Sequence, residues 1–199
     1  MTRQDVERFE EVIAAGGVAL FPADTVYGLA THPGSRDGVE RINEMKGRPP
    51  AKPSAVMAFS TAELPPLAPR LREAAERLLP GPVTLVVPNP EGLHPLACGP
   101  VPERLGIRVP AVPRPLADAR VTVLQTSANR SGEQDARSLA EVDPALRAAV
   151  DCVLDGGTLP GTPSTVIDLS SYEEDGSFEV LREGALTVAR VEELLRSRG

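Results

Sequence analysis

The chain has 199 residues, a hydrophobic fraction of 41% and a formal net charge of −7, which suit one globular domain over residues 1–199. The acidity argues against a protein that coats nucleic acid, and no apolar run approaches the roughly 20 residues that span a bilayer. The charged N-terminus resembles a helix rather than an export signal, and Cys98 and Cys152 lack metal-ligand spacing, so we expect a cytoplasmic protein with two free thiols.

Apolar periodicity and capping residues predict the helices and strands. In chain order, the sequence predicts a helix after Thr2, a strand at 18–21, a polar turn, a helix after Ser35, a strand at 54–59, a helix at 71–79, strands at 83–87, 106–110 and 121–126, a helix after Ser138, strands at 150–155, 164–169 and 178–182, and a helix after Thr187. A polar loop joins the last two strands, which predicts a hairpin. Because the elements interleave without strict β-α-β alternation, we expect an α/β fold of the α+β kind, with helices packed on a twisted sheet of parallel and antiparallel strands.

A group of cations begins in the second predicted helix and continues into the loop after it. Arg41, Lys46, Arg48 and Lys52 fall close together in an acidic chain, and the glycine and prolines among the last three exclude a regular helix. An Arg fork and two ammonium groups on a constrained loop suit a polyphosphate. The loop does not match the GxxxxGK[ST] pattern of a P-loop, and a solvated basic loop is the alternative that charge alone leaves open.

Polar side chains follow two of the predicted strands. Asp24, Thr25 and Tyr27 come just after the strand at 18–21, and the carboxyl ends of strands in α/β sheets are common ligand sites. Thr25 is a hydrogen-bonding group there, whereas Asp24 as a turn cap and Tyr27 as a core residue are open alternatives. The stretch TSANRSG follows the strand at 121–126 in the same way, and its hydroxyl and amide groups predict a ligand-binding turn.

Ser127 in that turn is interpreted as a ligand-binding group rather than a nucleophile, because the chain has no GxSxG pattern and no evident histidine partner. Arg108 and Arg182 lie within or at the ends of apolar strands, where each must meet an anion, pair with a carboxylate or reach solvent. Ser164 opens the strand at 164–169 after a Gly/Pro loop. Together these residues favour an anionic ligand.

The ordered motifs resemble those of the YrdC family of threonylcarbamoyl-AMP synthases. The resemblance rests, in family order, on PADTVYGLA, KGRPPAKP, PGPVTLVVP, GIRVP, TSANRSG, PSTVIDL and VLREGAL. It implies a twisted mixed sheet with a concave basic cavity. It also implies a nucleotidyltransferase that condenses L-threonine, bicarbonate and ATP into threonylcarbamoyl-AMP and pyrophosphate, for the t6A modification at position 37 of tRNA.

The family pattern also implies roles for ten residues of this chain. Lys46 and Arg48 are the expected catalytic pair, and the residues expected to bind ATP are Lys46, Arg48, Lys52, Ser127, Asn129 and Arg182. The residues expected around threonine are Thr25, Arg108, Gln125 and Ser164, with Arg108 facing the carboxylate. Mg²⁺ is expected to bridge the ATP phosphates, with most of its ligands from phosphate and water.

Some positions depart from the family pattern. Ala23 replaces a common Thr, Ala30 a usual Gly, and Met57 a His that reaches threonine in larger relatives. The stretch between Arg108 and Ser127 is several residues shorter than usual, and the chain ends soon after VLREGAL, as in the short single-domain form. Threonine selectivity, oligomeric state and the protein that accepts the adenylate stay open.

Two readings compete with the synthase. The first is a module that binds double-stranded RNA or tRNA through a concave basic patch, against which the net charge of −7 argues. The second is a paralogue that keeps the fold without synthase activity, against which the intact KGR and TSAN motifs argue. The expected partners are the substrates, the downstream machinery that transfers the threonylcarbamoyl group to tRNA and, in the first reading, the RNA itself.

Overall fold

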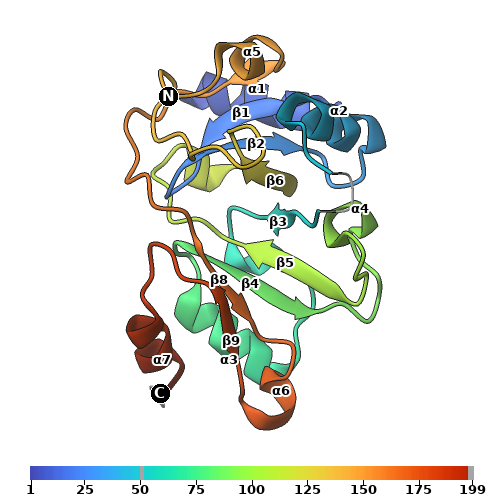
Figure 1. Cartoon of the computed structure of the whole chain (residues 1–199), viewed down its shortest axis with the longest axis vertical. Helices are drawn as coiled ribbons and strands as arrows, with labels where there is room; N and C mark the ends of the chain where they lie inside the picture. Colours follow the sequence, from blue (N-terminus) through green and yellow to red (C-terminus); the bar gives the residue numbers. More distant parts are fainter. Residues whose placement is uncertain (50–51, 197–199) are drawn as a thin grey trace.

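The computed structural model describes residues 1–49 and 52–196, and its strands form one sheet (Figure 1). Within the described residues the sheet has nine strands in the order β7-β1-β2-β6-β3-β5-β4-β8-β9. The strands are β1 (Ala19–Pro22), β2 (Tyr27–Thr31), β3 (Ala55–Met57), β4 (Val83–Pro88), β5 (Arg104–Arg108), β6 (Val123–Ser127), β7 (Cys152–Val153), β8 (Thr165–Asp168) and β9 (Glu179–Arg182). The pairs β1–β7, β3–β5 and β4–β8 are parallel, and the other pairs are antiparallel. The prediction of a mixed sheet is confirmed, as is the β8–β9 hairpin.

The helices pack on this sheet and cap as the sequence indicates. They are α1 (Arg3–Ala14), α2 (Arg36–Lys46), α3 (Pro69–Leu78), α4 (Pro95–Cys98), α5 (Pro144–Ala148), α6 (Tyr172–Asp175) and α7 (Val188–Arg196), with 3₁₀ turns at Thr61–Glu63 and Leu116–Asp118. Thr2 and Asp5 form a capping box that satisfies two backbone N–H groups at the start of α1. None of the helices in the described part of the chain is long and apolar enough to cross a membrane.

The core is divided by the sheet into separate apolar clusters. Phe9 of α1 packs against Phe21 and Phe59, with ring centroids 5.7 and 6.0 Å away. Leu20 of the same strand as Phe21 points the other way, into a cluster that includes Ile42 of α2. Helices α3 and α7 cover a further cluster with β4, β5 and β8, at the lower end of Figure 1. Strands such as β1 and β2 are thus buried on both faces, which explains their nearly continuous apolar runs, whereas the edge strand β9 is largely exposed.

Two sequence predictions about local structure are wrong. The stretch expected as a polar turn after β1 contains β2, whose five residues are all buried and pair with both β1 and β6. No helix begins at Ser138, where the chain forms turns. The helix begins instead at Pro144, because the Asp143 side chain accepts a hydrogen bond from the N–H of Ala145 and proline suits the first helical position.

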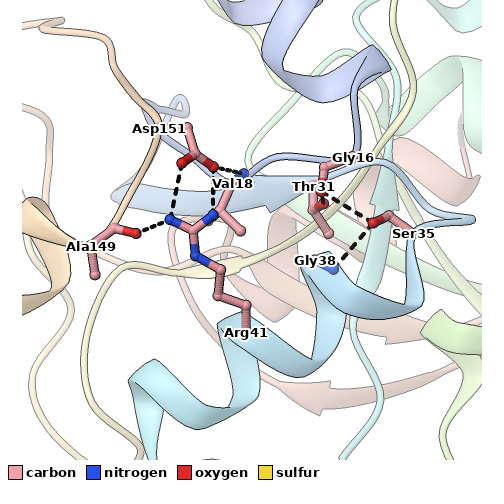
Figure 2. Close-up of polar contacts among 8 residues, drawn as sticks. All are labelled: Gly16, Val18, Thr31, Ser35, Gly38, Arg41, Ala149 and Asp151. Carbon is pink, nitrogen blue, oxygen red and sulfur yellow. Dashed lines mark hydrogen bonds and ion pairs between the residues drawn. The ribbon is translucent and has the colours of Figure 1, made fainter.

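Arg41 connects α2 to the edge of the sheet (Figure 2). Its guanidinium donates to both carboxylate oxygens of Asp151, at 2.6 and 3.0 Å, and to the carbonyl of Ala149. The same carboxylate accepts from the N–H of Val18 at 2.8 Å, and its hydrogen bonds with Arg41 hold the pKa of Asp151 below its usual value. The prediction that Arg41 belongs with the other cations is therefore wrong, because Asp151 already neutralises it.

The start of α2 packs closely on the turn that ends α1, as Figure 2 also shows. The Ser35 hydroxyl accepts from the N–H of Gly38 and lies 3.1 Å from the carbonyl of Gly16, to which it donates. A Cβ on Gly38 would meet the Thr31 hydroxyl at 2.1 Å and the Gly16 carbonyl at 2.8 Å. Glycine is therefore required at position 38 by close approach, and the contact fixes α2 over β2.

Candidate active site

A cavity of about 430 Å³ opens where the middle strands of the sheet meet the loop after α2. We call it the central cavity. Its floor includes Val86 of β4, Gly106 of β5, Ala55 of β3 and Gln125 of β6, which are paired neighbours across four adjacent strands. Because the two middle residues of this row have small or absent side chains, the sheet is hollow there. Of the ten residues that the family pattern implies, seven line the cavity: Arg48, Lys52, Arg108, Gln125, Ser127, Ser164 and Arg182.

Lys46 does not line the central cavity, although it was expected to hold phosphates. Its ammonium donates to the carbonyl oxygens of Ser127 and Asn129, the latter at 2.5 Å, and so binds the end of α2 to the TSAN turn. Burial, and then the neighbouring Arg48 guanidinium, lower the pKa of Lys46 to about 8. The ammonium faces backbone carbonyls in this structure, and its expected phosphate contact stays a prediction.

Arg48 braces the loop that carries Lys52. One terminal nitrogen donates to the Ser54 hydroxyl at 2.8 Å, and the other to the carbonyls of Lys52, at 3.1 Å, and Pro53. Its Nε is buried with no hydrogen-bond partner among the described residues, and burial lowers the pKa of the guanidinium. The side chain therefore has both a loop-holding role and an unsatisfied donor. Residues 50–51 of the KGRPPAKP motif lie outside the described part of the chain.

Arg108 is held by a carboxylate from the turn between β1 and β2. Its Nη2 donates to Asp24 and, at 2.8 Å, to the hydroxyl of Thr25, and the two charged side chains are only 5% and 6% exposed. Asp24 also accepts from the N–H of Ala111 at 3.0 Å. Burial lowers the pKa of Arg108, while Asp24 acts in the opposite direction. Thr25 does not line the central cavity, and its hydroxyl accepts from Arg108; its expected threonine contact stays a prediction.

The opposite side of the central cavity is formed by β8, β4 and β9. The hydroxyls of Ser164 and Thr84 are 3.0 Å apart, and the Arg182 guanidinium donates to the Ser164 carbonyl at 2.8 Å. Thr84, which lines the cavity, was missed in the sequence. The available signal was a hydroxyl within the apolar run VTLVV. These contacts place polar groups from three strands at one wall.

The TSAN turn is held internally. Ser127 donates to the amide oxygen of Asn129, whose amide nitrogen donates to the carbonyls of Arg130, at 3.0 Å, and Glu133, at 2.6 Å. Ser127 lines the cavity, whereas Asn129 does not, and the expected contact of Asn129 with the nucleotide stays a prediction. The amide of Asn129 is engaged in shaping the turn, and its effect on a ligand is indirect.

Cations outnumber carboxylates in the lining of the central cavity, although two of them, Arg104 and Arg108, are ion-paired with carboxylates outside the lining. Arg48, Lys52, Arg104, Arg108 and Arg182 line it, and Asp135 is the one carboxylate among the described lining residues. Arg104, which was also missed in the sequence, is paired with Asp168 at 2.6 Å. In a chain of net charge −7 this excess of positive charge favours a polyanion.

A metal ion has few protein ligands available here. Among the described residues, no group of three or more His, Cys, Asp or Glu side chains is arranged to hold a metal ion. Asp135 and the hydroxyl of Ser127 are oxygen donors at the cavity wall. This donor set fits a hard ion that keeps most of its water or phosphate ligands, as Mg²⁺ does.

A known family model matches most of this chain. The Sua5/YciO/YrdC family model, described as "Telomere recombination", matches residues 11–184. The chain belongs to the Sua5/YciO/YrdC family. The resemblance seen in the sequence is thereby confirmed, across most of the chain.

Curated members of the Sua5/YciO/YrdC family match along much of the chain. The threonylcarbamoyl-AMP synthase of Pyrococcus abyssi (strain GE5 / Orsay) is 32% identical, and the match covers 97% of this chain and 59% of that protein. The threonylcarbamoyl-AMP synthase of Xanthomonas axonopodis pv. citri (strain 306) is 34% identical, with 77% of this chain and 87% of that protein covered. The chain thus spans less than two thirds of the Pyrococcus relative and most of the Xanthomonas one.

Solved structures of the Sua5/YciO/YrdC family share the fold. P. abyssi Sua5 complexed with L-threonine superposes with a TM-score of 0.84 at 30% identity, over 98% of this chain and 58% of that one. E. coli YciO superposes with a TM-score of 0.78 at 25% identity, over 92% and 91% of the two chains. The expected mixed α/β fold is confirmed.

Proposed function

We propose that this protein is an L-threonylcarbamoyladenylate synthase, which condenses L-threonine, bicarbonate and ATP to threonylcarbamoyl-AMP and pyrophosphate. The observation that carries the proposal is the central cavity, where five cations and several hydroxyls converge against one carboxylate. Such a lining suits a triphosphate together with an amino-acid carboxylate. The relatives named threonylcarbamoyl-AMP synthase, and the Sua5 structure with L-threonine, support this choice of substrates.

The chemistry requires anions to be gathered and a phosphoryl group to be stabilised. The threonine amine attacks bicarbonate or CO₂ to give a carbamate, and bicarbonate loses water in this step. A carbamate oxygen then attacks the α-phosphorus of ATP, and the bond to the β-phosphate oxygen breaks to release pyrophosphate. Cations that are fixed before the reaction lower the barrier, because they face the charge that develops on the transferring group.

We assign the cavity residues as follows. Arg48, Lys52 and Arg182 face the phosphates, with Ser127 beside them. Arg108, Gln125 and Ser164 surround threonine. The Nε of Arg108 has no hydrogen-bond partner among the described residues and is the donor proposed for the carboxylate of threonine. Lys46, Asn129 and Thr25 act as positioning residues, because they hold the TSAN turn and Arg108.

Mg²⁺ accompanies ATP in this proposal and supplies charge neutralisation on the phosphates. Asp135 and the Ser127 hydroxyl are the protein oxygens that fit it. The protein is proposed to act in the cytoplasm as a nucleotidyltransferase, with the adenylate passed to machinery that modifies tRNA at position 37.

The proposal is tested by pyrophosphate release from purified protein, together with mass spectrometry of the adenylate. We expect release only when threonine and bicarbonate are both present. The variant Arg48→Lys should lose about 10²-fold or more in turnover, since an ammonium cannot reproduce the forked contacts. Arg114→Ala, at a side chain 83% exposed and outside the cavity, is the matched control and should keep wild-type turnover.

Three outcomes contradict the proposal. Pyrophosphate release that ignores threonine would exclude this reaction. Salt-sensitive binding of tRNA without ATP turnover would favour an RNA-binding module. A folded protein with neither activity would favour a paralogue that keeps only the fold.

A further inference from the structure

A second hollow, of about 600 Å³, lies at the other end of the strands that border the central cavity. Strands β2 and β6 are antiparallel, and the central cavity lies at their Tyr27 and Ser127 end. The second hollow lies beyond their other end, between the end of α1, the turn after β2, the start of α4 and the segment before β6. It shares no lining residue with the central cavity among the described residues. We call it the histidine groove.

Both histidines of the chain line this groove. His94 is the one non-glycine residue of the described chain in the left-handed region, with φ 49° and ψ 55°. Its side chain does not cap α4, which begins at the next residue. Backbone strain of this kind costs about 1 kcal/mol or more and persists where surrounding structure requires it. The strain, together with a ring that has no capping task, distinguishes His94 from a histidine in an ordinary loop.

The tautomer of His32 favours an anion over a metal ion in the groove. Its Nδ1 accepts a hydrogen bond from the N–H of Gly34 at 3.1 Å. The proton of the neutral ring therefore sits on Nε2, which becomes a donor and has no lone pair for a metal. This Nε2–H has no hydrogen-bond acceptor among the described residues, and such a donor suits an oxyanion.

The charges around the groove point the same way. Arg120 lines the groove, and no carboxylate is among its described lining residues. Two carboxylates lie beside the groove without lining it: Glu10 accepts from the backbone N–H of Arg120 at 2.6 Å, and Glu63 lines a smaller hollow that His94 also borders. Arg36 lines a further hollow beside Pro95, and adds positive charge. Burial, and then His32, lower the pKa of His94 below its ordinary value.

We propose that the histidine groove binds a phosphate monoester with a small apolar body. The Arg120 guanidinium, the Nε2–H of His32 and the ring of His94 would hold the phosphate. The apolar body would lie against the remaining lining, which includes Ile13, Pro33 and Val121. A dianion matches this set better than a monoanion, because a guanidinium and two imidazole rings line a single space.

The pH dependence of such binding has a definite sign. A bound dianion favours the imidazolium of His94 and therefore raises its pKa. Binding takes up a proton, so affinity increases as the pH falls from about 8 to about 6.5, where a phosphate monoester is still largely dianionic.

The test uses the full chain with ¹³Cε1-labelled histidine, which gives two ring signals that His94→Gln assigns. Phenyl phosphate is the probe, and inorganic phosphate and phenol report its two halves separately. We expect phenyl phosphate to shift both signals and to bind more tightly at about pH 6.5 than at about pH 8. Arg120→Ala should weaken binding about tenfold or more, whereas Arg114→Ala, at an exposed arginine outside the groove, should not.

The histidine ring signals report on the groove and not on the central cavity, because no histidine is among the described residues that line the central cavity. Arg48→Ala should leave the histidine shifts unchanged even if ATP turnover is lost. Silent histidine signals would overturn the proposal, as would equal affinity in Arg120→Ala. Shifts of equal size with phenol would show an apolar site only, and would also overturn it.

Discussion

Removal of the Asp24 carboxylate should destabilise the protein strongly, because it leaves Arg108 buried without its counter-ion. The two side chains are 6% and 5% exposed, so water screens the pair little. Breaking a buried pair by removing one partner costs about 3–5 kcal/mol. We expect the lower end, about 3 kcal/mol, for Asp24→Ala, since Arg108 keeps its hydrogen bond to Thr25 and lines the central cavity.

Urea denaturation measures this change, and thermal unfolding gives a second reading. At about 2–4 °C per kcal/mol for a chain of this size, the melting temperature should fall by about 6–12 °C. The matched control is Asp118→Ala, which breaks the ion pair with Arg114. Those side chains are 41% and 83% exposed, so the loss should be below about 1 kcal/mol.

A double variant separates the electrostatic contribution of the ion pair to stability from the packing contribution of the two side chains. Asp24→Leu with Arg108→Met replaces both charges by apolar groups and should recover most of the lost stability without restoring turnover. An Asp24→Ala protein as stable as the wild type would refute the reasoning. Equal losses in Asp24→Ala and Asp118→Ala would refute it too, because burial would then not decide the cost.

Three further predictions concern stability, and urea denaturation checks each. The pKa of Lys46 is about 8 in the folded chain and 10.5 as its ordinary value, so the folded chain binds fewer protons than the unfolded chain between these pH values. The free energy of unfolding should therefore rise with pH more steeply in the wild type than in Lys46→Met. Parallel curves of unfolding free energy against pH would contradict this. Tyr27→Phe should lower the free energy of unfolding by about 1–2 kcal/mol, because the carbonyl of Gly157 and the N–H of Gly156 lose their hydrogen bonds to the Tyr27 hydroxyl. An unchanged midpoint of urea denaturation would contradict this. Thr165→Val should lower the free energy of unfolding by about 2–3 kcal/mol, because the N–H of Gly184 and both the N–H and the carbonyl of Leu186 lose their hydrogen bonds to the buried hydroxyl. A decrease in unfolding free energy below about 0.5 kcal/mol would contradict this.

The sequence predicts much of the fold because apolar runs and caps are local signals. Thr2 with Asp5, and Ser35, cap helices as expected, and the strands from β3 to β6 appear at the predicted runs. Strand β2 was not found, because its YGLAT sequence contains glycine and a polar start and owes its extended form to pairing with β1 and β6. The cap at Asp143 was missed because Ser138 and Glu141 offered a similar local signal.

For the candidate site, residue types were predictable and side-chain directions were not. Arg108 in an apolar strand had to meet an anion, pair with a carboxylate or reach solvent, and only the folded chain brings Asp24 to it from the turn between β1 and β2. Lys46 looked like a phosphate ligand by composition, whereas the packing of α2 points it at the TSAN carbonyls. Arg104 and Thr84 carried signals too weak to separate them from ordinary strand residues.

Strand β3 is only three residues long, yet it is the link between the two halves of the described sheet. It pairs with β6 on one side and β5 on the other, beneath the central cavity. The two halves of the sheet are therefore joined by a strand of three residues, close to where Gln125 and Arg108 line the same cavity. A molecule that contacts both of these residues would bridge the two halves, so the torsional stiffness of the whole sheet would depend on occupancy of this one position.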